Sequence, residues 1–281
     1  MDAVVIMAYK SPIIKKTVDS LVKYTPRAVP IYLLDQAHPS MVEEKKRMRD
    51  AAEPYGDRVK VVEYYINERI AFAPWAMVNF LEDNPDIDRV VKVDDDVIFG
   101  SEFYFGLAEA YGIKSNVLFV CAICPIQIWG LQILVDRCGI KVDDRLLNPE
   151  IMLDTIVHNP HLATEVWEQT TPPSKILDKL RVGDRFVEVP LFRASTDSRD
   201  PSQRADFMIN QYLAHRDVIL YHCRNLNGIN TSDEINYQRT RQRSGRPVIM
   251  DTWSLAYHFS GAPWAGYAMD NHYPMIKDIE F

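Results

Sequence analysis

The segment VVKVDDDVIF, residues 90–99, places Asp94, Asp95 and Asp96 between two apolar runs. The run before the triplet has the composition of a buried strand, whereas adjacent carboxylates repel one another and are costly to bury without a partner. Any fold of this chain must therefore bring a partner to the end of that strand. Side chains two apart on a strand point the same way, so we expect Asp94 and Asp96 to converge and Asp95 to turn away.

The first hundred residues alternate strand and helix patterns. Short apolar runs predict strands at 3–9, 29–35, 59–66 and 89–93, and helical patterns fall at 12–24, 40–52 and 71–81. This order is typical of a parallel sheet with helices on both faces. Such sheets bind ligands beyond the carboxyl ends of their strands, and the acidic triplet lies at one of these ends.

The second half of the chain is less regular. Its patterns predict strands at 117–123, 186–192 and 218–221, helices at 148–170 and 205–214, and an apolar stretch at 248–259 that closes the fold. The chain has 281 residues, no internal repeat and no low-complexity linker. We therefore expect a single domain with two lobes.

Composition narrows the class of protein. The net charge of −7 argues against a surface that grips nucleic acid everywhere, although a local basic patch is compatible with it. No apolar run approaches the roughly 20 residues that cross a bilayer. The start, MDAVVIMAYK, lacks the basic region and cleavage site of a signal peptide, so we expect a cytoplasmic protein, in the host cytoplasm if the source is viral. Cys121 and Cys124 form a lone CxxC without a second pair, which favours buried reduced thiols over a zinc site.

Asp94 and Asp96 are candidate metal ligands. Mg²⁺ and Mn²⁺ prefer oxygen ligands, and either ion would relieve the repulsion within the triplet. Two carboxylates alone also leave coordination positions for a phosphorylated ligand.

With its preceding strand, the triplet resembles the DxD signature of GT-A glycosyltransferases. The resemblance covers the order of elements over residues 1 to 100. It implies an α/β, Rossmann-like GT-A fold, with a mostly parallel sheet flanked by helices. It also implies a nucleotide-sugar lobe at 1–110 and an acceptor lobe at 111–281. In that family the first acid, here Asp94, faces the ribose and the metal, and the last, here Asp96, binds the metal that holds the diphosphate.

A second motif, AYHFSGAPW at residues 256–264, resembles the HxxGxxKPW closing segment of the glycogenin-like, retaining branch of that family. The resemblance implies that His258 is a third metal ligand, that Gly261 approaches the diphosphate and that the sugar keeps its configuration. The segment here is two residues shorter and lacks the Lys, so the diphosphate needs another cation. An imidazole ligand favours Mn²⁺ over Mg²⁺.

Further residues of the donor site follow from the same resemblance. Asp35 ends the second strand, where the family holds an acid that contacts the nucleobase. Ala8, Tyr9 and Lys10 follow the first strand and would lie beside the base and ribose. Arg69 precedes the helix before the triplet and would reach the diphosphate.

Two segments supply candidates for the remaining roles. Asp206, near the start of the helix expected at 205–214, resembles the acid that the family presents to the acceptor: a general base in inverting enzymes, an orienting group in retaining ones. The segment INYQRTRQRSGRP holds four arginines: Arg239, Arg241, Arg243 and Arg246. These would neutralise the diphosphate, with Arg241 and Arg243 the central candidates, or contact an anionic acceptor.

The sequence therefore predicts a metal-dependent glycosyltransferase that uses Mn²⁺ or Mg²⁺. The expected donor is a nucleoside-diphosphate sugar, with UDP and glucose as defaults. The expected acceptor is a hydroxyl of a glycan or small molecule, or of a hydroxymethylated base in phage-type DNA. Two alternatives stay open: a nucleotidyltransferase, although MAYKSPIIKK lacks the glycines of a phosphate loop, and a non-catalytic sugar- or nucleotide-binding module.

Overall fold

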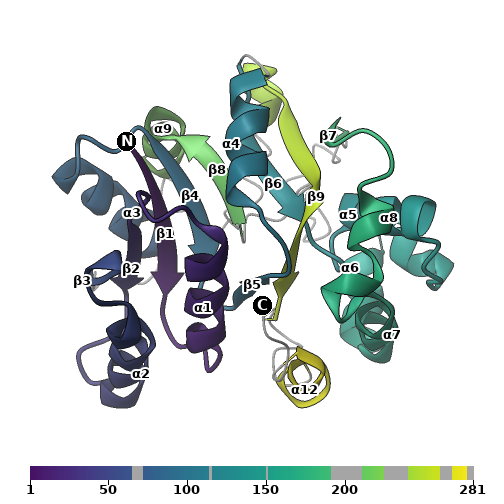
Figure 1. Cartoon of the computed structure of the whole chain (residues 1–281), viewed down its shortest axis with the longest axis horizontal. Coiled ribbons are helices and arrows are strands. Elements are labelled where there is room, and N and C mark those ends of the chain that lie inside the picture. Colours follow the sequence, from purple (N-terminus) through teal and green to yellow (C-terminus); the bar gives the residue numbers. More distant parts are fainter. Residues whose placement is uncertain are drawn as a thin grey trace.

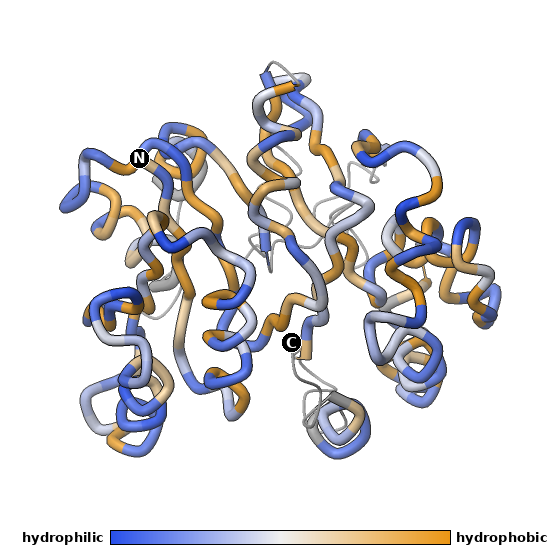
Figure 2. Tube along the Cα trace, viewed as in Figure 1, coloured by the Kyte–Doolittle hydropathy of each residue, from blue (hydrophilic) through white to orange (hydrophobic). Residues whose placement is uncertain are grey.

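The structure is a computed structural model that describes residues 1–64, 72–113, 116–149, 151–190, 211–224, 240–259 and 268–276. It is a single α/β domain built on a sheet flanked by helices, which confirms the expected fold class (Figure 1). Figure 2 shows the hydrophobic strands inside and the hydrophilic turns of the helices outside. No helix within the described residues is both long and apolar enough to span a bilayer.

The N-terminal half contains the four expected strands. These are β1 (Asp2–Ala8), β2 (Ile31–Asp35), β3 (Val59–Glu63) and β4 (Arg89–Asp94), and they pair in parallel in the order β3-β2-β1-β4. Ala8 lies opposite Asp35, and Met7 lies opposite Asp94. The carboxyl ends of β1, β2 and β4 therefore meet at one edge of the sheet.

Helices cover both faces of this parallel half. One face packs against α1 (Ile14–Tyr24) and α2 (Val42–Ala52), which leads into the short helix η1 (Glu53–Arg58), and against α4 (Tyr104–Ile113). The other face packs against α3 (Phe72–Asp83) and α9 (Arg216–Arg224). Each strand contributes alternate side chains to the two cores, as the period of two requires.

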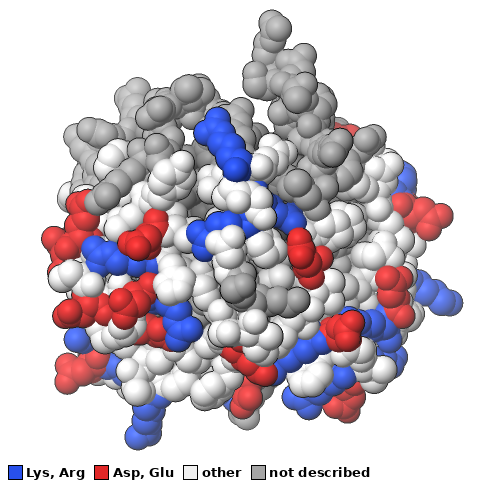
Figure 3. Space-filling model, turned by 90° about the horizontal axis from the view of Figure 1, so that it is seen from above, with Lys and Arg blue, Asp and Glu red and all other residues white. Residues whose placement is uncertain are grey.

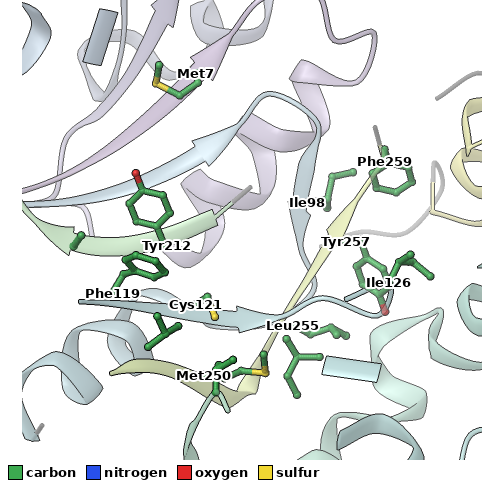
Figure 4. Close-up of a cluster of buried hydrophobic side chains, with 14 of the residues drawn as sticks. Met7, Ile98, Phe119, Cys121, Ile126, Tyr212, Met250, Leu255, Tyr257 and Phe259 are labelled. Carbon is green, nitrogen blue, oxygen red and sulfur yellow. The ribbon is translucent and has the colours of Figure 1, made fainter. Parts of the chain in front are cut away.

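The second half extends the same sheet with mixed pairing. β8 (Gln211–His215) is antiparallel to β4 and β6 (Phe119–Ile123), and β6 is parallel to β9 (Val248–His258). β5 (Val97–Phe99) and β7 (Phe186–Glu188) pair antiparallel with opposite ends of β9. In Figure 4, Phe119 and Tyr212 face each other between β6 and β8, with ring centroids 5.2 Å apart.

Short helices pack beside the second half of the sheet. They are α5 (Ile128–Ile133), η2 (Leu134–Cys138), η3 (Asp144–Leu147), α6 (Met152–His158), α7 (His161–Thr170), η4 (Pro173–Lys175) and α8 (Leu177–Leu180). The chain near its end adds η5 (Ala268–His272) and α12 (Tyr273–Ile276). His272 is buried, with its ring stacked on that of Trp167 at 5.0 Å, which fixes this segment on α7.

Two of the expected elements are wrong. Residues 211–214, expected in a helix, lie in β8, and residues 218–221, expected in a strand, lie in α9. Pairing with strands on both sides buries Gln211–Ala214 and overrides the local helical pattern. The apolar run at 218–220 is too short to distinguish a strand from the buried side of a helix. The burial expected of Cys121 and Cys124 is confirmed.

Gly106 lets α4 approach β9 closely. A Cβ at this position would overlap Asp251 Oδ2 and lie 2.6 Å from Arg185 Nη2. Asp251 is fully buried and cannot retreat easily, because it accepts hydrogen bonds from Arg185, Ser254 and the Trp253 amide. This contact joins α4, β9 and the segment before β7.

Gly106→Ala should therefore lower the free energy of unfolding by roughly 1–3 kcal/mol through overpacking. Gly112→Ala is the matched control in the same helix, because nothing lies within 4 Å of its Cβ position. It should raise the free energy of unfolding by about 0.5–1 kcal/mol through helix propensity. Urea denaturation of both variants measures these changes, and equal shifts would contradict the close approach.

Candidate active site

Asp94, Asp96 and His258 come together from three positions of the sheet. Asp94 ends β4, Asp96 lies in the turn that follows, and His258 ends β9. The β5–β9 ladder places His258 opposite Val97, and the Phe259 amide donates to the Asp96 carbonyl at 3.1 Å. One ligand atom from each of the three side chains lies within 4.8 Å of the other two.

The donor set suits a divalent cation. Two carboxylates and an imidazole fit Mn²⁺, which accepts both oxygen and nitrogen ligands. Asp96 is 9% exposed and His258 17% exposed, whereas Asp94 is 32% exposed. The group is therefore shielded but reachable from solvent. It is the one cluster of three or more potential metal ligands found across the ranges that the structure describes.

The close approach of two carboxylates shifts the pKa values within the group. Burial raises the pKa of Asp94, and the Asp96 carboxylate adds to this while Lys92 opposes it. Burial by itself would lower the pKa of His258, but the Asp96 and Asp94 carboxylates outweigh it and leave the pKa above its ordinary value. The His258 Nε2 and Asp96 Oδ1 atoms are 3.3 Å apart. A bound cation would neutralise the two carboxylates in place of a protonated imidazole.

Asp95 has a different task. It turns away from the metal group, as the alternation along a strand predicts, and its Oδ2 accepts the amides of Tyr9, Lys10 and Ser11 at 2.8, 3.1 and 3.0 Å. Its carbonyl accepts the Thr17 hydroxyl at 3.0 Å. Burial, followed by the nearby Asp96, raises the pKa of Asp95 to about 6, and the amides of Tyr9 and Ser11 oppose that rise. The middle acid of the triplet therefore holds the loop between β1 and α1 against the turn after β4.

The structure places the residues proposed for the nucleoside at the same edge. Ala8 is buried and Lys10 is exposed, with its ammonium 5.4 Å from the Tyr9 ring centroid. Asp35 is buried; Lys45 donates to its Oδ2 at 2.6 Å, and the Ala37 amide donates to its Oδ1 at 2.9 Å. A base contact by Asp35 would have to share or displace these donors, and it stays a prediction.

Lys92 was missed by the sequence analysis. It donates to Asp94 Oδ1 and is 12% exposed, so an ammonium lies directly beside the candidate metal group. The signal was present, because Lys92 lies two residues before Asp94 and therefore on the same face of the strand.

Two of the four arginines contact backbone carbonyls near the start of β9. Arg241 and Arg243 precede β9, whereas His258 ends it (Figure 1). Arg241 is buried and donates to the Val189 and Pro190 carbonyls, and Arg246 donates to the Asn116 and Val117 carbonyls. Arg243 is exposed. The diphosphate contact expected of Arg241 and Arg243 stays a prediction.

Figure 3 shows the end of the molecule opposite the metal group, where β9 begins. Among the described residues, basic and acidic side chains are interspersed on this face. The arrangement gives no support to the expected contact with an anionic acceptor such as DNA. Four of the proposed residues, Arg69, Asp206, Arg239 and Gly261, lie outside the described residues, and their roles stay predictions.

Comparison with known proteins shows the fold but no family. No protein-family profile matches the chain, and no curated protein matches its sequence. Among solved structures, a putative glucose-1-phosphate thymidylyltransferase from Bacillus anthracis in complex with a sucrose is 13% identical, with a TM-score of 0.52 over 100% of this chain and 97% of that chain. GalNAc-T7 with UDP, GalNAc and Mn²⁺ is 14% identical, with a TM-score of 0.48; the match covers 92% of this chain but 43% of GalNAc-T7. At such identities the likeness to the thymidylyltransferase is one of fold alone.

Asp96→Asn and His258→Ala should each weaken Mn²⁺ binding by more than roughly tenfold, because each removes a ligand with a fixed position. Electron paramagnetic resonance of free Mn²⁺ in titrations of the folded proteins measures the change. Asp95→Asn is the matched control, since its carboxylate faces the β1–α1 loop, and it should bind Mn²⁺ within about threefold of wild type. Unchanged binding by both ligand variants would contradict the metal assignment.

Asp95→Asn should instead loosen the β1–α1 loop. An amide oxygen accepts hydrogen bonds more weakly than a carboxylate, and three donors depend on this one oxygen. We expect faster hydrogen exchange at the amides of residues 9–11, by roughly tenfold for each 1.4 kcal/mol lost. Exchange of β6 amides provides an internal reference, and equal acceleration there would indicate global destabilisation instead.

Proposed function

We propose that this chain is a metal-dependent glycosyltransferase that moves a hexose from a nucleoside-diphosphate sugar to a hydroxyl group. The observation that carries the proposal is the convergence of Asp94, Asp96 and His258 at the edge where β1, β2 and β4 end. This is where parallel α/β sheets bind nucleotides. UDP is the proposed carrier and glucose the default sugar, both from the resemblance of the two motifs.

In this proposal Asp94, Asp96 and His258 hold Mn²⁺, which supplies Lewis-acid stabilisation of the departing nucleoside diphosphate. The loop between β1 and α1 lies beside the proposed metal site. Asp95 holds the β1–α1 loop in place, so that Ala8, Tyr9 and Lys10 stay beside the metal group. Holding the nucleotide-sugar in a fixed position before the reaction lowers the activation barrier, because the entropy of orientation is lost on binding.

Asp206 is the proposed group for the acceptor. In a retaining reaction it would orient the acceptor hydroxyl or stabilise positive charge on the sugar ring, and in an inverting one it would accept the hydroxyl proton. We propose retention, because the His258 segment resembles the retaining branch. The proposed acceptor is a glycan or a hydroxylated small molecule.

The contact made by Asp95 supports a glycosyltransferase over a nucleotidyltransferase. Nucleotidyltransferases usually cradle phosphates with the amides of a glycine-rich loop after the first strand. Here the three amides after β1 donate to a carboxylate of the chain itself. A triphosphate would have to displace Asp95 to use them.

Thermal denaturation with UDP or UDP-glucose, with and without Mn²⁺, tests the donor site. A ligand at 100 times its dissociation constant adds about 2.7 kcal/mol to the free energy of unfolding, which a melting curve resolves. We expect stabilisation that requires both Mn²⁺ and nucleotide, and none with Asp96→Asn. Wild type should also release UDP from UDP-glucose, at least slowly to water.

Two outcomes would replace this proposal. Formation of pyrophosphate from UTP and glucose 1-phosphate, without UDP release from UDP-glucose, would assign a nucleotidyltransferase. Tight nucleotide-sugar binding without UDP release, in the presence of a panel of saccharide acceptors, would assign a binding module.

A further inference from the structure

Lys92 and Asp94 form a shielded ion pair at the edge of the metal group. Both side chains project from the same face of β4, and the Lys92 ammonium donates to Asp94 Oδ1. Their side chains are 12% and 32% exposed. Solvent and salt weaken such a pair less than a fully exposed one.

A metal ion bound without an anion would be repelled by the Lys92 ammonium. Asp94 carries one negative charge, which Lys92 already compensates, and a divalent ion held by Asp94, Asp96 and His258 would add positive charge beside it. Like charges a few ångströms apart repel several times more strongly in a shielded site than in water. Lys92 therefore disfavours the metal in the absence of an anion.

An anion on the same metal reverses this effect. Diphosphate oxygens that reach the metal enter the cluster to which Lys92 belongs, and they offer the ammonium a partner that replaces Asp94. We propose that Lys92 couples the two ligands: it weakens the binding of metal alone and strengthens the binding of metal and nucleoside diphosphate together. The identity of the anion rests on the proposed function, whereas the competition between Lys92 and the metal does not.

Titrations of Mn²⁺ into wild type and Lys92→Met, with and without saturating UDP, test the coupling. Met keeps the length of the side chain and removes the charge. We expect Lys92→Met to bind Mn²⁺ alone roughly tenfold more tightly than wild type. We also expect Mn²⁺ to bind Lys92→Met more weakly than wild type when UDP is saturating, so the factor by which UDP strengthens Mn²⁺ binding should fall by more than tenfold. By linkage the same loss applies to the effect of Mn²⁺ on UDP.

Two further variants separate this role from general effects of charge and packing. Lys15→Met removes the same charge from the Lys15–Asp19 pair on α1, whose side chains are 48% and 33% exposed. It should change neither the affinity for Mn²⁺ alone nor the factor by which UDP strengthens Mn²⁺ binding. Lys92→Arg keeps the charge and should retain weak binding of Mn²⁺ alone. If Lys92→Met does not fold, Lys92→Gln serves as the second neutral variant.

The outcomes distinguish this inference from the proposed function. If Mn²⁺ and UDP bind wild type together but Lys92→Met leaves both quantities unchanged, the inference is wrong and the proposed function stands. If UDP fails to bind wild type while Lys92→Met still tightens Mn²⁺, the nucleotide is wrong and the competition stands. Failure of Mn²⁺ to bind any variant overturns both.

Discussion

Repulsion among three adjacent carboxylates is the constraint on which the rest of this site depends. Each acid of the triplet meets a different partner: Asp94 the Lys92 ammonium, Asp95 three backbone amides and Asp96 the His258 imidazole. The partners of Asp95 and Asp96 come from the β1–α1 loop and from β9, so the charge of the triplet ties β1, β4 and β9 together at one edge. A local change in Asp95 or Asp96 therefore affects a contact that is distant in the sequence.

The division of tasks also sets what the site can bind. In parallel α/β sheets the amides that follow the first strand are a natural place for phosphate, because they point beyond the carboxyl ends. Asp95 fills that place, so phosphate charge has to be met elsewhere. The metal group and Lys92 are the adjacent positive or cation-binding features. The closing segment AYHFSGAPW lacks the lysine of the motif it resembles, and Lys92 on β4 places a cation beside the cluster.

Sequence patterns were sufficient for the parallel half and for the convergence of Asp94 with Asp96, whereas His258 came from the resemblance of the closing segment. Strands β1 to β4 have regular apolar periods, and the convergence of Asp94 with Asp96 follows from the alternation of side chains on a strand. The patterns failed at β8 and α9, where pairing and packing with distant elements decide the structure. They also gave no sign of the contacts of Arg241, whose guanidinium is buried against the Val189 and Pro190 carbonyls. Periodicity carries no information about such long-range partners, whereas it does specify which residues share a strand face.

A shared fold does not separate a glycosyltransferase from a nucleotidyltransferase, since both build an α/β sheet with carboxylates at its edge. The separation has to come from the partners of individual atoms. In this chain the atom that bears on the question is Asp95 Oδ2, because it accepts the three amides after β1 that a phosphate would otherwise use. The middle acid binds the β1–α1 loop, whereas the two flanking acids lie within 4.8 Å of His258 in an arrangement that could hold a cation. The alternation of side chains along the chain thus gives three identical residues different surroundings.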